Sequence, residues 1–335
     1  MTARGRAPAV SVVIPTRDRP RLLADAVACV ERQRDVAIEL IVVDDGSLDA
    51  VALSRPPTGA VVSTRVARHE HPRGDAAARN SAIAAAEAPW TAFLDDDDLW
   101  APDKLARQLA ALDAAAGCDY AYCGAVELDG RGGVIKDHPA PDPGRILTLL
   151  RRRNVMPAGS SNVIVRSAVL RALGGFDTGF ANLSDWDLWL RLAERGPAAC
   201  SPETLVAYRR HVIDGAMAGE ARSEHTLLER TDELLAQLRA LELKHGSAGN
   251  PLRVDRGSYA RWIVAGGARR SGRSPAAARL YLSLGWRARS ARTVAAAAPM
   301  LLGERTMGTL LRWWRRPAPA PDWVSARAAG PQDAA

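Results

Sequence analysis

Short apolar runs alternate with helical patterns through the first 128 residues, and this alternation constrains the fold more than any other feature of the chain. Five segments are typical of strands, namely residues 10–16, 38–43, 61–66, 91–94 and 120–128. Between them, residues 20–34, 75–86 and 102–116 have the apolar spacing or the alanine content of helices. Strands that alternate with helices predict an α/β fold, with a mostly parallel sheet and helices on both of its faces.

Polar residues follow three of these strands directly. Thr16-Arg17 ends the first, Asp44-Asp45 ends the second, and four consecutive aspartates, Asp95–Asp98, follow residues 90–94. Ligands bind beyond the carboxyl ends of the strands in such sheets, so the three clusters are expected at one edge. Adjacent carboxylates repel unless a cation offsets their charge, and Mg²⁺ and Mn²⁺ prefer carboxylate oxygens. The aspartates therefore predict a divalent cation site, with a solvated acidic turn before the next helix as the alternative.

The chain lacks the sequence signals of several other classes. Its cysteines form no CxxC pair, so neither a zinc knuckle nor a disulfide framework is predicted. No GxGxxG follows the first strand and no GxxxxGKS/T occurs, which gives no support to a dehydrogenase or a P-loop enzyme. We see no signal-peptide pattern, and no apolar run reaches the roughly 18 to 20 residues that span a bilayer. We therefore expect a cytoplasmic enzyme.

The net charge of +7 is unevenly distributed. Residues 251–316 hold fourteen Arg against two acidic residues, a local charge of +12, so the rest of the chain carries −5. A uniformly basic chain would suggest nucleic acid as a partner. This distribution instead predicts two functions or two separate surfaces, and no nucleic-acid partner.

The second half of the chain is less regular. We expect a strand over 159–165, a turn at 174–177, a helix over 184–195 and a short strand over 205–210. A long amphipathic helix is predicted over residues 220–244, and Arg-rich helices follow it. From residue 317 onward the chain is rich in Pro and Ala, which is typical of disorder.

Six segments together resemble the inverting, nucleotide-sugar-dependent family 2 glycosyltransferases. They are VSVVIPTRDR, IVVDDGS, RGDAAARNSAIAAA, WTAFLDDDDLWAPDKL, the pair GGFDTGF and SDWDLWLRL, and AYRRH, and they cover about residues 9–215. The resemblance implies the GT-A fold, in which a Rossmann-like sheet carries the site. It also implies a catalytic domain over 1–218, with a nucleotide-sugar half at about 9–128 and an acceptor half at about 129–218. Residues 219–316 would then be a C-terminal helical appendage and 317–335 a disordered tail.

The resemblance also implies where the donor binds. The residues expected at the base, the ribose and the phosphates are Pro15, Thr16, Arg17, Asp44, Asp45, Arg73, Arg79, Asp95 and Asp96. Asp44 or Asp45 would accept a hydrogen bond from the ring N–H of uracil; the alternative is an Asx turn before Gly46. Arg79 has the alternative of a charge on the helix surface, and Asn80 is a similar candidate.

The resemblance places the metal, Mn²⁺ or Mg²⁺, on the family's DxD motif. Asp95 and Asp97 would be its ligands here, with Asp97 the direct one, and Asp98 would cap the following helix. His211 in AYRRH would complete the metal site or contact phosphate, with a structural role as the alternative. His69–His71 does not add to it, because adjacent strand residues point to opposite faces, and we interpret this segment as surface.

The catalytic base is expected at the start of the 184–195 helix. Ser184-Asp185 stands where the family has a Glu-Asp pair, so Asp185 is the implied base and Asp187 the fallback. The alternative is that Ser184 and Asp185 only cap the helix. Asp177 and Trp186 are the expected acceptor contacts, and Ser184 is a departure from the usual Glu.

Three function hypotheses follow from these observations. The first is a metal-dependent inverting glycosyltransferase that moves a sugar from a nucleotide diphosphate sugar, in this family most often a UDP-sugar. Its acceptor would be a hydroxyl of a glycan, a lipid-linked glycan or a natural product. The second is a nucleotidyltransferase-like enzyme, although the Gly-rich phosphate loop of that class is missing after the first strand. The third is an inactive glycan-binding module, against which Asp95, Asp97 and Asp185 together argue.

Two interpretations of the Arg-rich region are open. Arg suits anionic headgroups and Trp suits the membrane interface, so its helices would contact the inner face of the cytoplasmic membrane peripherally. Alternatively they form an ordinary helical subdomain that packs on the catalytic core or on a second subunit in a homodimer. The aromatic residues in question are Trp262, Tyr281, Trp286, Trp313 and Trp314.

Overall fold

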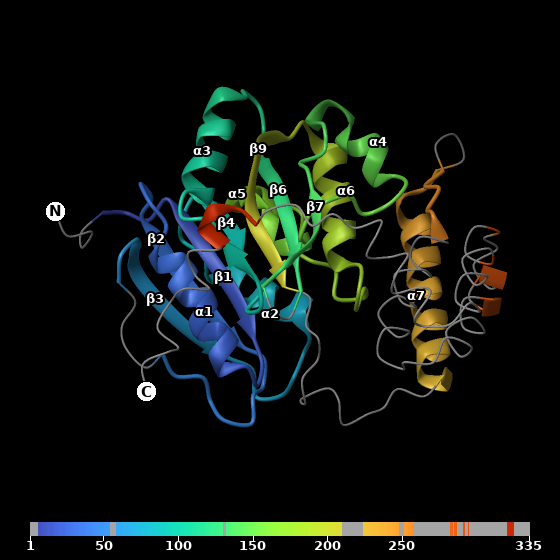
Figure 1. The fold of residues 1–335 in the computed structure, drawn as a ribbon, viewed down its shortest axis with the longest axis horizontal. Coiled ribbons are helices and arrows are strands. Elements are labelled where there is room, and N and C mark those ends of the chain that lie inside the picture. The colour runs from blue at the N-terminus through green and yellow to red at the C-terminus, as the bar shows by residue number, and fades with distance from the viewer. Residues whose placement is uncertain are drawn as a thin grey trace. The chain divides into compact units, whose positions relative to one another are not determined.

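The computed structural model describes residues 6–53, 58–129, 132–209, 224–247, 251–256 and 320–324, and also 282–283, 285–286, 291 and 294. The chain divides into two compact units. The first consists of Met1–Leu150, Asn154–Val212 and Ala318–Ala335, and the second of Arg151–Arg153 and Ile213–Pro317. The first unit contains the sheet (Figure 1).

The first unit is built on one mixed sheet with the strand order β3-β2-β1-β4-β8-β6-β9-β5, and β7 pairs with β6 outside this path. The strands are β1 (Val10–Thr16), β2 (Ile38–Asp44), β3 (Val61–Arg68), β4 (Trp90–Phe93), β5 (Leu99–Trp100), β6 (Tyr120–Leu128), β7 (Val134–His138), β8 (Ile164–Arg166) and β9 (Ala199–Arg209). β3, β2, β1 and β4 pair in parallel, as do β6 and β9, whereas β8, β5 and β7 pair antiparallel to their neighbours. The predicted α/β fold is confirmed, and its parallel half is the part with regular alternation of strands and helices.

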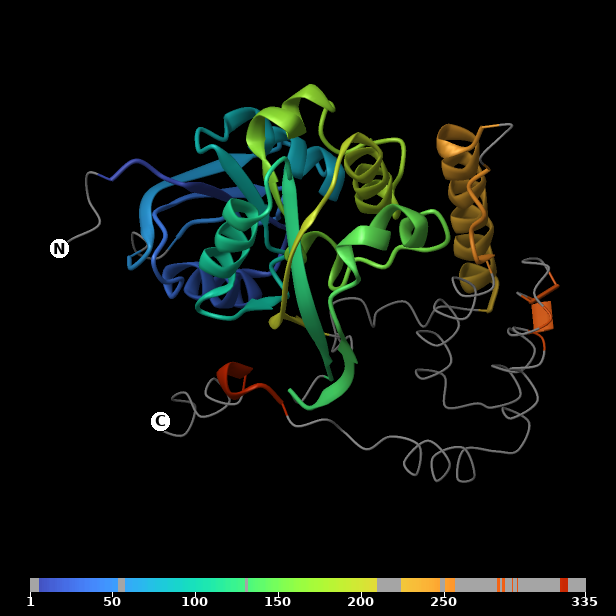
Figure 2. The ribbon, with the colours of Figure 1, turned by 90° about the horizontal axis from the view of Figure 1, so that it is seen from above.

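Helices cover both faces of this sheet. They are α1 (Pro20–Glu31), α2 (Asp75–Ala85), α3 (Lys104–Ala114), α4 (Ile146–Leu150), α5 (Ser167–Ala172) and α6 (Ser184–Arg195). Seen from above, α1 and α3 lie on one face of the sheet and α2 on the other (Figure 2). Val10, Val12 and Ile14 of β1 belong to one core cluster with residues of α1 and α3, because alternate strand residues share a face.

One predicted strand is mostly a turn. Only the last two residues of the 159–165 segment belong to a strand, β8 (Ile164–Arg166), while Gly159–Asn162 forms a 3₁₀ helix, η2. The physical reason lies just before and at its start, where Ala158 and Gly159 have φ angles of 52° and 50°. Two successive left-handed residues cannot continue a strand. A second 3₁₀ helix, η1 (Pro143–Arg145), precedes α4.

The segment 320–324 packs on the first unit. Val324 is 6% exposed and belongs to the core cluster, and the indole N–H of Trp323 donates to the carbonyl of Thr204 in β9 at 3.3 Å. The described part of the 317–335 segment therefore makes core contacts that its Pro- and Ala-rich composition did not predict.

The second unit contains α7 (Glu224–His245), which corresponds to the predicted long helix. Leu234, Leu238 and Leu241 are buried at helical spacing, and Leu252 is buried beyond the helix. Most of the Arg-rich region lies outside the described residues, including four of the five aromatic side chains named above; the fifth, Trp286, is 84% exposed. No helix among the described residues is long and apolar enough to cross a membrane.

Candidate active site

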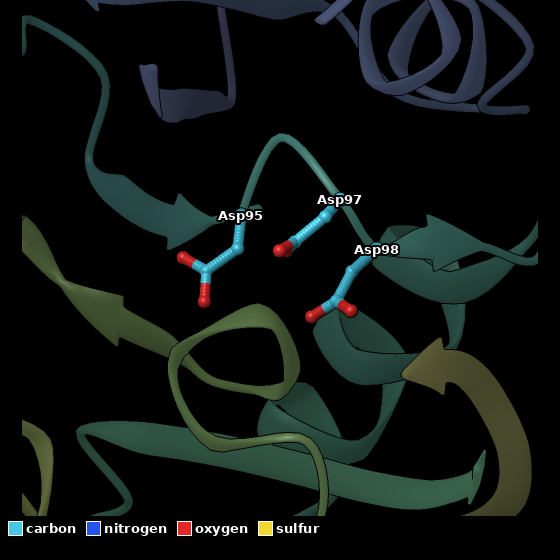
Figure 3. A group of neighbouring side chains, drawn as sticks. All are labelled: Asp95, Asp97 and Asp98. Atoms are coloured by element: carbon cyan, nitrogen blue, oxygen red, sulfur yellow. The ribbon is translucent and has the colours of Figure 1, made fainter. Parts of the chain in front are cut away.

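The loop between β4 and β5 brings three carboxylates together (Figure 3). One ligand oxygen from each of Asp95, Asp97 and Asp98 lies within 4.8 Å of the others. The Asp95 and Asp97 side chains are 31% and 19% exposed, so an ion has access to them, while Asp98 is fully buried. Carboxylate oxygens at this spacing are the donor set that Mn²⁺ or Mg²⁺ prefers, so the residues fit the implied metal.

The electrostatics of this acidic cluster also favour a cation. Burial raises the pKa of Asp95 to about 6, with Arg79 opposing the shift and Asp97 adding to it. Burial also raises the pKa of Asp98 well above its usual value, and the neighbouring carboxylates of Asp97 and Asp95 add to that shift. A bound cation would stabilise the charged forms of these carboxylates.

Two residues far away in the sequence hold the acidic loop in place. The Ser161 hydroxyl of η2 donates to Asp98 Oδ2 at 2.5 Å and accepts from the Asp95 backbone N–H at 3.0 Å. Arg209, at the end of β9, donates from its backbone N–H to Asp98 Oδ1 at 3.2 Å and from Nε to the Asp97 carbonyl at 2.8 Å. The expectation that Asp98 caps the next helix is wrong, because α3 begins only at Lys104 and the Asp98 carboxylate is fully engaged inside the protein.

Arginine side chains flank the carboxylates. Arg79 is 5% exposed; its Nη2 lies 2.5 Å from Asp95 Oδ1, and its guanidinium lies over the Phe176 ring at 5.4 Å. The alternative of a surface charge is therefore wrong for Arg79. Its buried Nε has no hydrogen-bond partner within the described part of the chain, which leaves a donor for a ligand. Asp185 also acts electrostatically on this guanidinium, so Arg79 lies near both proposed halves of the site.

Arg19 is a site residue that sequence reasoning missed. Its Nη1 lies 3.1 Å from Asp96 Oδ1 and 3.2 Å from Asp97 Oδ2, and the Thr16 hydroxyl donates to Asp96 Oδ2 at 2.7 Å. The available signal was its position three residues beyond the end of β1, at the same sheet edge as the aspartates. Of the neighbours that were named, Pro15 is buried and Arg17 is exposed.

The two aspartates at the end of β2, Asp44 and Asp45, organise the loops around them. Asp44 accepts from the backbone N–H groups of Ser47 and Val51 at 2.9 and 3.1 Å and from Arg68 at 2.8 Å. Burial alone would raise the pKa of Asp44, but these hydrogen bonds outweigh it and lower the pKa. The Asx-turn alternative therefore describes the contacts that Asp44 makes.

Asp45 ties the end of β3 to the start of α2. Its Oδ1 accepts from the Arg73 backbone N–H at 2.9 Å and lies 2.7 Å from His69 Nδ1, and its Oδ2 accepts from the Gly74 N–H at 2.8 Å. The interpretation of His69 as surface is wrong: it is 9% exposed and also contacts the Ser81 hydroxyl at 2.9 Å. The prediction assumed that residues 69–71 alternate between the two faces of a strand, but β3 ends at Arg68 and His69 lies beyond it. His71 is exposed, as expected. The Arg73 side chain is also exposed.

The start of α6 carries the proposed base. Asp185 is partly exposed; its Oδ1 accepts from the Trp186 backbone N–H at 2.6 Å and its Oδ2 from Asn154 Nδ2 at 3.0 Å. Desolvation raises the pKa of Asp185, against these hydrogen bonds and the charge of Arg79. The fallback, Asp187, is fully buried and accepts from Arg191 Nε and Nη2 at 2.9 and 2.7 Å.

The two residues that were expected to contact the acceptor, Trp186 and Asp177, have different environments in the structure. Trp186 is fully buried, and its indole N–H donates to the Leu150 carbonyl of α4 at 2.8 Å, so it packs between helices and the expectation that it contacts the acceptor is wrong. Asp177 accepts from the Gly179 N–H at 2.8 Å in a local turn. Asn80 uses both ends of its amide on the Phe176 backbone, each at 2.8 Å, and thereby fixes the Gly174–Asp177 turn. His211 lies outside the described residues.

Comparison with known proteins gives the class. Residues 11–174 match the family described as Glycosyl transferase family 2. The pre-mycofactocin glycosyltransferase of Mycobacterium tuberculosis is 31% identical over 211 residues, which cover 59% of this chain and 42% of that protein. An Escherichia coli protein named UDP-Glc:alpha-D-GlcNAc-diphosphoundecaprenol beta-1,3-glucosyltransferase WfgD is 25% identical over 183 residues, covering 55% of this chain and 69% of that protein. The chain spans about half the length of curated relatives such as the mycobacterial protein.

A solved structure shows the same fold. Residues 1–349 of Staphylococcus aureus TarS, in complex with UDP-GlcNAc, align with a TM-score of 0.52 and 17% identity, over 83% of this chain and 82% of that one. The first unit therefore has the GT-A fold that the sequence resemblance implied. Through residues 11–174, the chain belongs to glycosyl transferase family 2.

Proposed function

We propose that this protein is a metal-dependent inverting glycosyltransferase that transfers a sugar from a nucleotide diphosphate sugar to an acceptor hydroxyl. The observation that carries the proposal is the acidic cluster of Asp95, Asp97 and Asp98 at the sheet edge, with buried Arg79 acting on both Asp95 and Asp185. Such a site has room for a cation and a diphosphate, and it has a carboxylate nearby that can accept a proton.

The donor side would neutralise the leaving group. Asp95 and Asp97 would hold Mn²⁺ or Mg²⁺, which supplies positive charge to the diphosphate as it departs. Arg79 adds a fixed positive charge beside Asp95, and its free Nε donor would reach a phosphate or ribose oxygen. Thr16 and Arg19 hold Asp96 and keep the loop in shape for this contact.

The acceptor side would supply the general base. In a single displacement, the acceptor oxygen bonds to the anomeric carbon as the bond to the diphosphate breaks, and the configuration inverts. Asp185 would take the proton that the acceptor hydroxyl loses. It suits this role better than Asp187, because Asp187 is buried in an ion pair with Arg191 while Asp185 has solvent access.

UDP-sugars are the donors we propose first. Two similar proteins have names or titles that include UDP-Glc and UDP-GlcNAc. Asp45 Oδ2 accepts a single hydrogen bond among those described, from Gly74, and an oxygen of this type accepts a second donor such as the ring N–H of uracil. The acceptor would be a glycan, a lipid-linked glycan or a natural product.

The proposal is tested by transfer and hydrolysis assays on a panel of nucleotide sugars, with and without Mn²⁺. We expect metal-dependent turnover, its loss in Asp97→Ala, and weaker binding of the nucleotide diphosphate by that variant. Asp113→Ala, which removes an exposed carboxylate from α3, is the control and should retain activity. Near-normal turnover of Asp97→Ala in Mn²⁺ contradicts the metal assignment, and pyrophosphate release from a nucleoside triphosphate would favour a nucleotidyltransferase instead.

The Arg-rich region is the part of the proposal that concerns partners and location. We propose a cytoplasmic enzyme whose region 251–316 contacts either an anionic membrane surface or a second subunit. Binding to anionic but not neutral vesicles, reversed by salt, supports the membrane contact. No binding at low salt, together with a dimeric mass in solution, supports the second subunit.

A further inference from the structure

We propose that Asn154 is a positioning residue that orients the Asp185 carboxylate for proton transfer. The inference rests on the proposed function, in which Asp185 is the general base. Nothing in the sequence pattern of residues 151–158 marks Asn154 for this role, and its contact with Asp185 spans 31 positions of the chain.

The hydrogen bonds of Asn154 define which end of its amide faces the carboxylate. Asn154 Oδ1 accepts from the Met156 backbone N–H at 3.2 Å, so its NH₂ group faces Asp185 and donates to Oδ2 at 3.0 Å. The other carboxylate oxygen, Oδ1, accepts from the Trp186 N–H at 2.6 Å. Each oxygen of Asp185 thus accepts from a donor on a different residue, which fixes the plane of the carboxylate and leaves a lone pair for an acceptor hydroxyl.

The backbone that carries Asn154 closes around the same oxygen. Ala158 and Gly159 are both left-handed, with φ of 52° and 50°, and turn the chain back toward α6. A Cβ placed on Gly159 would lie 3.2 Å from Asp185 Oδ2. The segment from Asn154 to Gly159 therefore donates one hydrogen bond to Oδ2 and leaves little room beside this oxygen for a side chain at position 159.

The amide of Asn154 also favours the charged form of the base. Desolvation raises the pKa of Asp185, and the groups that oppose it are the Trp186 N–H, the guanidinium of Arg79 from α2, Asn154 and the backbone N–H of Asp185 itself. Arg79 is the charged group among them. The carboxylate of Asp187, two residues further along α6, forms its own ion pair with Arg191. Without the Asn154 hydrogen bond, the effect of desolvation would be opposed less strongly. The pKa of Asp185 would then rise, and its carboxyl group would keep its proton to a higher pH.

The test is the pH dependence of kcat in the full-length protein for wild type, Asn154→Ala and Asn154→Asp, with a donor that the wild type turns over. Asn154→Ala should lower kcat by about tenfold and shift the acidic limb of the profile upward by about one pH unit. Asn154→Asp keeps the shape but adds a like charge, and should shift the limb further. KM for the donor and binding of UDP with Mn²⁺ should not change, because the described hydrogen bonds of the Asn154 side chain are with Asp185 and Met156.

The outcomes separate this inference from the proposed function. A fall in kcat without movement of the acidic limb, or weaker UDP binding, would overturn the positioning role. Transfer at a wild-type rate by Asp185→Asn would instead overturn the base assignment and, with it, the basis of the inference. If no donor is turned over, thermal unfolding of Asn154→Ala, Asp185→Asn and the double variant decides: we expect changes in Tm that are non-additive by about 2 °C or more, and additive changes reject the contact.

Discussion

Lys104, the first residue of α3, should give the stability of this protein a pH dependence that one substitution removes. The side chain is fully buried, with Nζ 2.9 Å from Gln108 Oε1 and 3.9 Å from the centroid of the Trp100 ring. Within the described residues, no carboxylate forms an ion pair with it. Burial lowers the pKa of Lys104 from 10.5 to about 7, because desolvation disfavours the ammonium form.

The sign of the effect follows from the two protonation states. In the unfolded chain Lys104 keeps its proton up to about pH 10.5, whereas in the folded protein it loses it near pH 7. Between these values the unfolded state binds more protons, so the free energy of unfolding rises with pH. From pH 7 to pH 9 the gain from this residue is about 2 kcal/mol.

Urea unfolding at pH 7, 8 and 9 measures this gain. Lys104→Met keeps the unbranched stem and removes the titrating group, so the difference in free energy of unfolding between wild type and variant should change by about 2 kcal/mol over this range. The variant should gain most, relative to wild type, at pH 7. Lys136→Met on β7 removes an exposed lysine and is the control. Parallel pH profiles for wild type and Lys104→Met would refute the reasoning.

Two further substitutions test how the turn after α5 and the α6 ion pair are held. Gly175→Ala should lower Tm by several degrees more than Gly174→Ala. Both residues have left-handed φ angles, 70° and 76°, but of the two only Gly175 would carry a Cβ that clashes, with the side-chain amide of Asn80. Equal losses in calorimetry would contradict this. Asp187→Asn should cost about 3 kcal/mol of stability in urea unfolding, because it leaves the charge of Arg191 opposite a neutral amide. The turnover of Asp187→Asn per folded molecule should stay within about tenfold of wild type. A loss of stability below about 1 kcal/mol would show that the ion pair does not stabilise the fold.

The parallel half of the sheet was predictable because local pattern and tertiary arrangement agree there. The strands β1, β2 and β4 are short, buried and mostly apolar runs, and parallel pairing puts the polar residues at their carboxyl ends at one edge. That is how Thr16, Asp45 and Asp95 were expected on the same side. The antiparallel strands β8 and β5 are two or three residues long, which is too short to leave a periodic signal.

The partners of the site residues were not predictable, because they depend on contacts across long stretches of chain. The bond from Ser161 to Asp98 spans 63 positions, and the bond from Asn80 to Phe176 spans 96. The polar Gly159–Asn162 segment inside an apolar context was the available signal for η2, since a strand there would bury unpaired hydroxyl and amide groups. Trp186 illustrates the opposite error: an aromatic residue beside a proposed base suggested ligand contact, whereas its bulk fills the core.

The 3₁₀ turn η2 joins the two proposed halves of the site. At one end, Gly159 lies against Asp185 Oδ2, where a Cβ would lie 3.2 Å away. Two residues later, Ser161 bonds both the Asp95 backbone and the Asp98 carboxylate. The carbonyl of Ser161 is fixed in turn by the indole N–H of Trp100 at 2.7 Å. A single turn therefore links the proposed cation ligands to the proposed base, and this gives a physical reason for the small residues in it: a larger side chain at either position would displace one group relative to the other.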